Sequence, residues 1–216
     1  MSQALRRAMA LPRLDDDRNH LRSVLMLVGG GERSGDYASR MIDEAGSLGG
    51  AVSMSAAQLY RLEVPLSVAC NLSVLKAAHT AALRRIAAER PLIDGCGAAL
   101  DYLHATMAHL PHEVFRVLFL DRRRRLIRDE VMASGTVTRC SVYLREVVGR
   151  ALQLASSHLV LVHNHPSGCL EPSWEDRMLT KRLTEAAAAV EIYVDEHLII
   201  GRGGHFSFRN AGMIYK

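Results

Sequence analysis

The sequence is poor in the residue types that mark disulfide-rich, membrane-spanning or secreted proteins. Among its 216 residues there are 6 prolines, 4 cysteines and 1 tryptophan. The cysteines are widely spaced and form no CxxC pair, so we expect reduced thiols rather than a disulfide framework. They are Cys70, Cys96, Cys140 and Cys169. No apolar run approaches the roughly 18 residues of a membrane span, and the acidic residues 15–17 interrupt any signal-peptide pattern. We therefore expect a cytoplasmic protein without a membrane segment.

The sequence also lacks a large excess of charge of one sign. The net charge is +4, and residues 1–91 hold 12 Lys and Arg against 9 Asp and Glu. Residues 92–216 hold 15 against 14, so neither part has the strong basic excess of a dedicated nucleic-acid-binding protein. Hydrophobic residues make up 49% and charged residues 23%, which is typical of a globular chain rather than a disordered one.

The first part of the chain has the pattern of short helices. Apolar residues recur at helical spacing in residues 36–45, 55–62 and 72–88, and glycine pairs or triplets separate these segments. Pro91 marks the expected boundary, because the residue before a proline is biased out of the helical region. We predict a helical domain over residues 1–91.

The second part mixes strands and helices. Residues 114–120 and 126–132 have strand patterns on either side of the charged turn 121–125, which is typical of a hairpin. Further strands are expected at 158–162, 192–194, 198–200 and 206–208, and helices at 98–110, 144–154 and 174–189. We predict an α/β (α+β) fold, with the helical domain followed by a mixed sheet flanked by helices over residues 92–216.

One segment carries residues suited to metal chemistry. His163 and His165 follow a buried strand two positions apart, so their imidazoles point to the same side of an extended chain. The helix that begins near Trp174 brings the carboxylate of Asp176 back in its first turn, and Ser173 is a suitable N-cap. Two imidazoles and one carboxylate make a three-ligand zinc set that leaves a fourth position for water.

The same segment resembles a known motif. HNHPSG followed by PSxxD is similar to the JAMM (MPN+) metallopeptidase motif, and more narrowly to the RadC family. The likeness runs from about Leu92 to Ile214, through FLDRRRRLIRDEV, SGTVTRCSVYLREVV, DEHLIIG and FSFRNAG. The resemblance implies a JAMM/MPN-type sheet of cytidine-deaminase-like architecture, with Zn²⁺ held by His163, His165 and Asp176. It also implies hydrolysis of peptide or isopeptide bonds in a peptide or protein substrate.

The resemblance further implies a catalytic glutamate at the start of the first strand, where this sequence has Glu113. A carboxylate there can take a proton from a metal-bound water and pass it to the leaving amine. Glu130 is the alternative, because a hairpin brings the end of its second strand close to the start of its first. Ser173 is expected to help orient the tetrahedral intermediate, in addition to capping its helix.

Other residues near these motifs have simpler interpretations. We expect His197 to be a hydrogen-bonded structural residue rather than a ligand, and Cys169 to lie near the metal without binding it. Arg122–Arg125 are expected to form a solvated turn, although they could contact phosphate. Trp174 is expected to pack against the sheet.

The helical domain resembles the N-terminal domain of RadC proteins, which carries a helix-hairpin-helix element. The glycines of that hairpin let backbone amides approach DNA phosphates. Residues 63–69 (EVPLSVA) occupy the corresponding stretch and contain no glycine. The alternative function, a DNA-repair or recombination accessory protein with a structural or vestigial metal site, would require DNA binding despite this loss.

Overall fold

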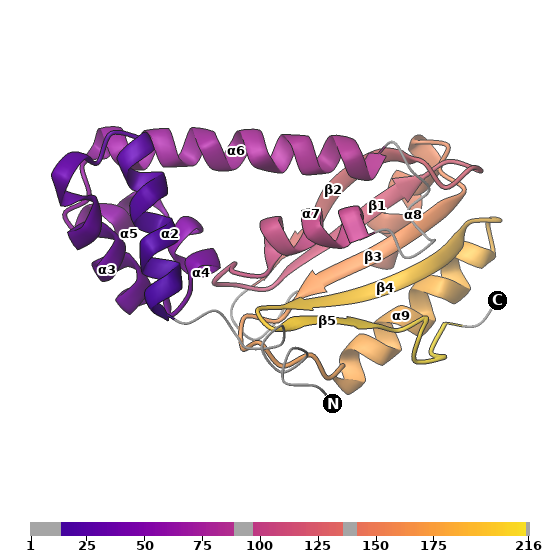
Figure 1. Cartoon of the computed structure of the whole chain (residues 1–216). Helices are drawn as coiled ribbons and strands as arrows, with labels where there is room; N and C mark the ends of the chain where they lie inside the picture. The colour runs from indigo at the N-terminus through magenta and orange to yellow at the C-terminus, as the bar shows by residue number, and fades with distance from the viewer. Residues whose placement is uncertain (1–13, 89–96, 136–141, 215–216) are drawn as a thin grey trace, which may run out of the picture. The chain divides into compact units, whose positions relative to one another are not determined.

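The computed structural model describes residues 14–88, 97–135 and 142–214 (Figure 1). The chain divides into two compact units, Met1–His79 and Thr80–Lys216. The predicted boundary at Pro91 and the residues Cys96 and Cys140 lie outside the described residues. Cys70 and Cys169 are free thiols.

The first unit is helical, as predicted. Its elements are α2 (Leu14–Leu27), η1 (Gly31–Arg33), α3 (Ser34–Ala45), α4 (Leu48–Val52), α5 (Ala56–Arg61) and the first turns of α6 (Leu66–Ala88). The helices bury one shared apolar core that includes Leu21, Met41 and Leu59. The helix predicted over residues 36–45 is confirmed by α3, which ends at Gly46 in a left-handed conformation with φ 73°. The helix predicted over residues 55–62 is confirmed by α5.

Two features of this unit differ from the prediction. The helix α2 was not predicted, although its three first-turn aspartates suit the positive end of the helix dipole. The helix α6 begins at Leu66 rather than Leu72, because the carbonyl of Pro65 accepts the amide of Ala69 and starts the helix immediately after the proline. The turn between α5 and α6 is therefore shorter than the predicted stretch 63–69.

The helix α6 is long and apolar enough to cross a membrane by length and composition alone. An 18-residue window within it has a mean hydropathy of 1.2, and 17% of that window is buried. Asn71, Lys76 and His79 interrupt its apolar residues, so the sequence shows no continuous apolar run here. A single helix of this kind is weak evidence for a membrane span, and the absence of a membrane segment stays a prediction.

The second unit contains the predicted mixed sheet. Its strands are β1 (Val114–Leu120), β2 (Leu126–Ser134), β3 (His158–Asn164), β4 (Tyr193–Gly201) and β5 (Gly204–Ser207), in the spatial order β2-β1-β3-β4-β5. The strands β3 and β4 are parallel, and the other neighbours are antiparallel. Its further helices are α7 (Gly97–Met107), α8 (Leu144–Gln153) and α9 (Trp174–Ala188).

Helices cover both faces of this sheet (Figure 1). Because side chains alternate along a strand, Val160 and Val162 of β3 pack on the α7 side. Leu159 and Leu161 pack on the opposite side, against α8 and α9. The same alternation places His163 on the α8/α9 side and Asn164 on the α7 side, at the carboxyl end of β3.

A single strand, β4, replaces the two strands predicted at 192–194 and 198–200. The charged residues between them suggested a break, but the pairing with β3 continues through an irregularity between Val194 and Glu196. The extra residue there, Asp195, lies 2.8 Å from His158 Nδ1 and 3.2 Å from Arg124 Nε. These contacts let the strand continue with its charged residues half-buried.

Candidate metal centre

The three predicted metal ligands come together at the carboxyl end of β3. His163 belongs to this strand, and His165 extends it by one step, since its amide donates to the carbonyl of Ile200 in β4. Gly168, with φ 81°, then turns the chain toward α9. Asp176 lies in the first turn of α9, so the β3–α9 connection returns a carboxylate to the two imidazoles.

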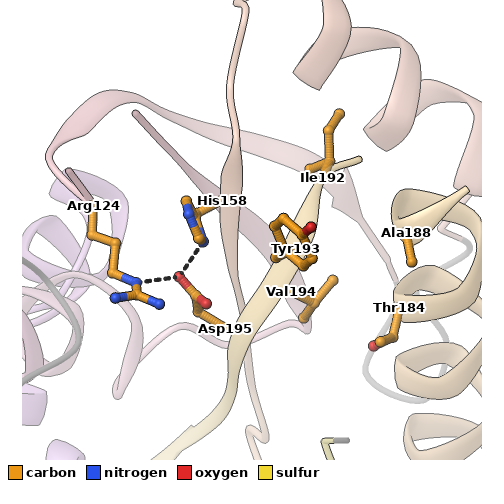
Figure 2. A pocket seen from close by; sticks show the side chains of 8 residues that line it. All are labelled: Arg124, His158, Thr184, Ala188, Ile192, Tyr193, Val194 and Asp195. Atoms are coloured by element: carbon orange, nitrogen blue, oxygen red, sulfur yellow. Dashed lines mark hydrogen bonds and ion pairs between the residues drawn. The ribbon is translucent and has the colours of Figure 1, made fainter. Parts of the chain in front are cut away.

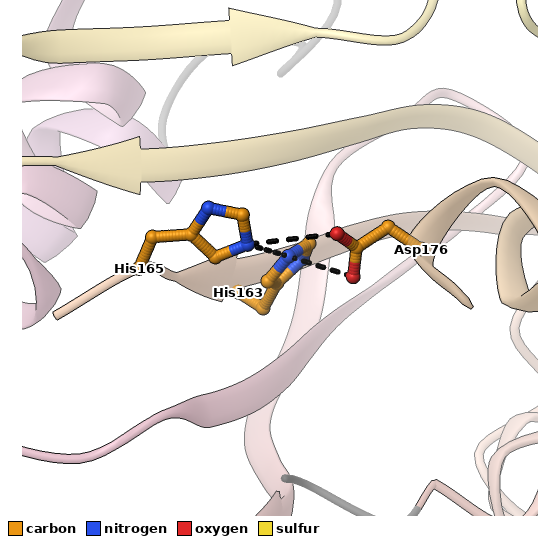
Figure 3. A group of neighbouring side chains, drawn as sticks. All are labelled: His163, His165 and Asp176. Atoms are coloured by element: carbon orange, nitrogen blue, oxygen red, sulfur yellow. Dashed lines mark hydrogen bonds and ion pairs between the residues drawn. The ribbon is translucent and has the colours of Figure 1, made fainter. Parts of the chain in front are cut away.

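The ligand atoms of these residues converge on one point, as Figure 3 shows. His163 Nε2 lies 3.0 Å from His165 Nε2 and 3.2 Å from Asp176 Oδ1. His165 Nε2 lies 3.5 Å from Asp176 Oδ2. Zinc bonds of about 2.0–2.2 Å in a tetrahedral site separate neighbouring ligand atoms by about 3.4 Å. The donor set therefore fits Zn²⁺ in both type and spacing.

Hydrogen bonds behind the imidazoles fix their tautomers. The carbonyl of Cys169 can only accept, so His165 Nδ1–H donates to it over 2.7 Å and the lone pair of Nε2 faces the centre. Cys169 thus contributes its backbone, and its thiol does not belong to the cluster among the described residues.

A longer, buried series of hydrogen bonds fixes the tautomer of His163. Thr180 Oγ1 donates to the carbonyl of Asp176, so it must accept from His197 Nδ1–H, both over 2.6 Å. His197 Nε2 then accepts from His163 Nδ1–H over 2.8 Å, which leaves the Nε2 lone pair of His163 at the centre. His197 is fully buried, and burial holds its pKa well below the usual range, consistent with the neutral form that these hydrogen bonds require.

Asp176 is held by the cap of its own helix. Ser173 donates to Asp176 Oδ2 through its amide (2.8 Å) and its hydroxyl (2.6 Å), while the amide of Asp176 donates to Ser173 Oγ. Burial alone would raise the pKa of Asp176, but the imidazoles of His163 and His165, which face its carboxylate, hold that pKa well below its usual range. The hydrogen bond to Asp176 also raises the pKa of His165, so a proton and a metal ion compete for its Nε2.

Glu113 lies immediately before β1 and is half-buried. Burial raises the pKa of its carboxyl group. The charge of Asp176 acts in the same direction, whereas His163 and His165 lower this pKa. The carboxyl group therefore lies within electrostatic range of all three ligands.

Glu130, the alternative to Glu113, is engaged elsewhere. The hairpin does not bring Glu130 opposite Glu113. Glu130 pairs with Val117, and it is the amide of Gly135 that donates to the carbonyl of Glu113. Both carboxylate oxygens of Glu130 accept from Arg150, at 2.6 and 2.8 Å. The hydrogen bond from Arg150 lowers the pKa of Glu130. Of the two glutamates, Glu113 is therefore the one whose carboxyl group interacts with the His163, His165 and Asp176 cluster.

The remaining candidates lie outside the cluster. The carboxylate of Asp121 accepts the amides of Arg123 and Arg125 and shapes the hairpin turn. The expectation that Trp174 packs against the sheet is wrong, because its side chain is 70% exposed.

A separate cavity of about 330 Å³ lies between the end of α9 and the start of β4. Figure 2 shows Asp195 and Arg124 beside this cavity. None of the predicted catalytic or metal-binding residues lines the cavity.

Two residues of the site were missed in the sequence. Thr180 lies four positions after Asp176 on the same face of α9, and that spacing could have indicated it. Asn164 lies between the two ligand histidines. Its side chain bonds to the backbone of His112 and Val114, which are remote in sequence, and no local pattern indicates such a partner.

Comparison with known proteins agrees with this arrangement. The family described as RadC-like JAB domain matches residues 93–213. A UPF0758 protein of Rhodobacter capsulatus is 44% identical over 178 residues, which cover 82% of this chain and 83% of the relative. UPF0758 proteins of Burkholderia thailandensis and Burkholderia mallei are each 45% identical over 150 residues, 69% of this chain. The matched residues make up 57% and 54% of these two relatives. The chain thus belongs to the RadC-like JAB domain family.

Proposed function

We propose that this protein is a zinc-dependent hydrolase of JAMM type that cleaves peptide or isopeptide bonds. The observation that carries the proposal is the convergence of three ligand atoms, two of which are imidazole nitrogens whose tautomers are fixed by hydrogen bonds behind the rings. His163 and His165 would hold Zn²⁺ through Nε2, and Asp176 through Oδ1, because its Oδ2 is occupied by Ser173. The bound ion would supply a water of lowered pKa and polarise the scissile carbonyl.

Glu113 is the proposed general base and acid. A half-buried carboxylate of raised pKa can accept the proton of the attacking water and then deliver it to the leaving amine. The pKa is raised mainly by burial, which supports proton exchange closer to neutral pH than an exposed glutamate would allow.

Ser173 is proposed to act mainly through Asp176. Its hydroxyl donates to Oδ2, so it orients the carboxylate and directs Oδ1 to the metal. A direct hydrogen bond from Ser173 to the tetrahedral intermediate would require the hydroxyl to turn away from Asp176.

The competing proposal, a DNA-associated accessory protein, has less support. The helices α5 and α6 form a helix–turn–helix pair, but Glu63 takes the left-handed position of the turn, with φ 57°. The exposed carboxylate of Glu63 would repel a phosphate that approached the backbone amides of this turn. We therefore propose a peptide or protein substrate rather than DNA.

Metal content tests this proposal. Elemental analysis of tag-free protein purified without chelator should give about one zinc per chain. The variant His165→Ala should lose the zinc, and His205→Ala, which removes an exposed histidine of the same unit, should keep it. Glu113→Gln should also keep zinc, and should lose hydrolysis by a factor of about 10²–10⁴ against any peptide that the wild type cleaves. Protein that stays free of zinc after reconstitution would rule out the proposal.

A further inference from the structure

Glu113 lies immediately before β1, beyond the last residue pair that joins β1 to β3. The ladder between β1 and β3 ends where Phe115 pairs with His163. The amide of Val114 and the carbonyl of His112 lie beyond this last pair, on the side of β1 that faces β3. Buried backbone groups need hydrogen-bond partners, and here the partner is a side chain.

Asn164 supplies both hydrogen bonds. Its Oδ1 accepts from the amide of Val114 over 2.8 Å, and its Nδ2 donates to the carbonyl of His112 over 3.1 Å. The residue is 1% exposed. One amide group therefore holds the main chain on both sides of Glu113.

We propose that Asn164 is the positioning residue for Glu113, an inference that rests on the proposed hydrolase. Asn164 lies between His163 and His165. The two histidine side chains therefore point to one side of β3, while the side chain of Asn164 points to the other and holds the backbone of Glu113, the proposed base. A side chain without both a donor and an acceptor would leave His112 or Val114 unpaired. The backbone of Glu113 could then turn, and its carboxylate would leave the proton-accepting position.

The test uses the whole chain loaded with Co²⁺, whose visible spectrum reports the site, and acetohydroxamate as a probe ligand. A hydroxamate that chelates the metal gives its hydroxyl proton to a carboxylate beside it. Glu113→Gln should therefore weaken acetohydroxamate binding about tenfold, the loss of one charge-assisted hydrogen bond. Asn164→Ala should weaken it to a similar degree while still binding about one Co²⁺ per chain, since all three ligands remain.

Two further readouts separate positioning from a general loss of structure. The double variant Glu113→Gln/Asn164→Ala should bind acetohydroxamate no more weakly than Glu113→Gln, because both changes act through the same carboxylate. Hydrogen exchange at the amide of Val114 should accelerate in Asn164→Ala. The matched control Asn210→Ala, at an exposed position of the same unit, should behave as wild type in both measurements.

A second variant covers the case in which Asn164→Ala does not fold. Asn164→Asp keeps the acceptor for Val114, and as a carboxylate it cannot donate to the carbonyl of His112, so at a pH where it is ionised it should also weaken acetohydroxamate binding without adding to Glu113→Gln. Wild-type affinity in a folded Asn164 variant, or effects that add to those of Glu113→Gln, would overturn the positioning role alone. Failure of the wild type to bind Co²⁺ would overturn the proposed hydrolase, and this role with it.

Discussion

Tyr102 links α7 to β1 and β2 through a buried polar network. Its hydroxyl donates to Asp129 Oδ2, and Arg116 donates to both, at 3.1 Å to the hydroxyl and 3.2 Å to the carboxylate. The side chain of Asp129 is 5% exposed. Burial, followed by the hydrogen bond to Asp129, raises the pKa of Tyr102 to about 12. The protonated hydroxyl is therefore part of the folded structure.

Removing this hydroxyl should destabilise the second unit. We expect Tyr102→Phe to lower the free energy of unfolding by about 1–3 kcal/mol, because the buried carboxylate of Asp129 loses a donor. Tyr193→Phe is the matched control, since that tyrosine is 57% exposed, and its change should stay within about 0.5 kcal/mol. Urea unfolding at neutral pH measures both.

The effect of Tyr102→Phe should depend on pH in one direction. The pKa of Tyr102 is higher in the folded chain than its ordinary value of 10.0. The stabilisation is therefore complete below pH 10 and is lost as the pH rises through 10 to about 12. The difference between wild type and Tyr102→Phe should shrink over this range. A difference that is constant up to pH 12 would contradict the assigned hydrogen bond.

At the scale of elements, the turn between α5 and α6 uses a glutamate where the backbone favours glycine. Glu63 has φ 57°, and the amide of Val64 closes the turn on the carbonyl of Leu59. Arg40 lies 2.8 Å from the carboxylate of Glu63, but that side chain is 76% exposed. The ion pair is therefore worth little against the cost of a left-handed non-glycine residue.

A pair of variants separates the contribution of the ion pair from the cost of the left-handed backbone. Glu63→Ala removes the ion pair and keeps the left-handed strain, whereas Glu63→Gly removes both. We expect the glycine variant to be more stable than the alanine variant by about 1 kcal/mol. Urea unfolding followed by circular dichroism measures the difference. Equal stability of the two variants would show that this turn carries no strain.

The elements that the sequence predicted well are those with local signals. The strand β1 has the predicted bounds because six apolar residues, interrupted only by Arg116, lie between Glu113 and the charged turn. The helix α9 starts where predicted because Ser173 and Asp176 form a capping box. The strand β4 was divided in two, since the partners of Asp195 come from other elements and leave no local trace.

The same distinction applies to the candidate site. The spacing of His163, His165 and Asp176 along one strand–turn–helix segment was enough to predict that their side chains meet. The choice between Glu113 and Glu130 was not available locally, because it depends on Arg150 from α8. Contacts between distant segments, such as that between Asn164 and the backbone around Glu113, become visible only in three dimensions.

At the scale of the whole molecule, the two units have separate apolar cores that share one helix. The helix α6 gives Val68 and Leu72 to the first core, and Ala87 to a core of the second unit. Whether the units unfold independently depends on how strongly this helix couples them. The only tryptophan of the chain, Trp174, belongs to the second unit and lies two residues before Asp176, so its fluorescence reports that unit alone.

Zinc should therefore raise the melting temperature of one unit selectively. A metal that binds only the native second unit stabilises it by about 4 kcal/mol at a thousandfold excess over its Kd. The transition seen by Trp174 fluorescence should move upward, while the part of the circular dichroism change that belongs to the first unit should stay in place. His165→Ala should abolish the shift. If zinc moves both transitions together in wild type and neither in His165→Ala, then α6 couples the two cores into one cooperative structure, and the metal centre stabilises the helical unit as well.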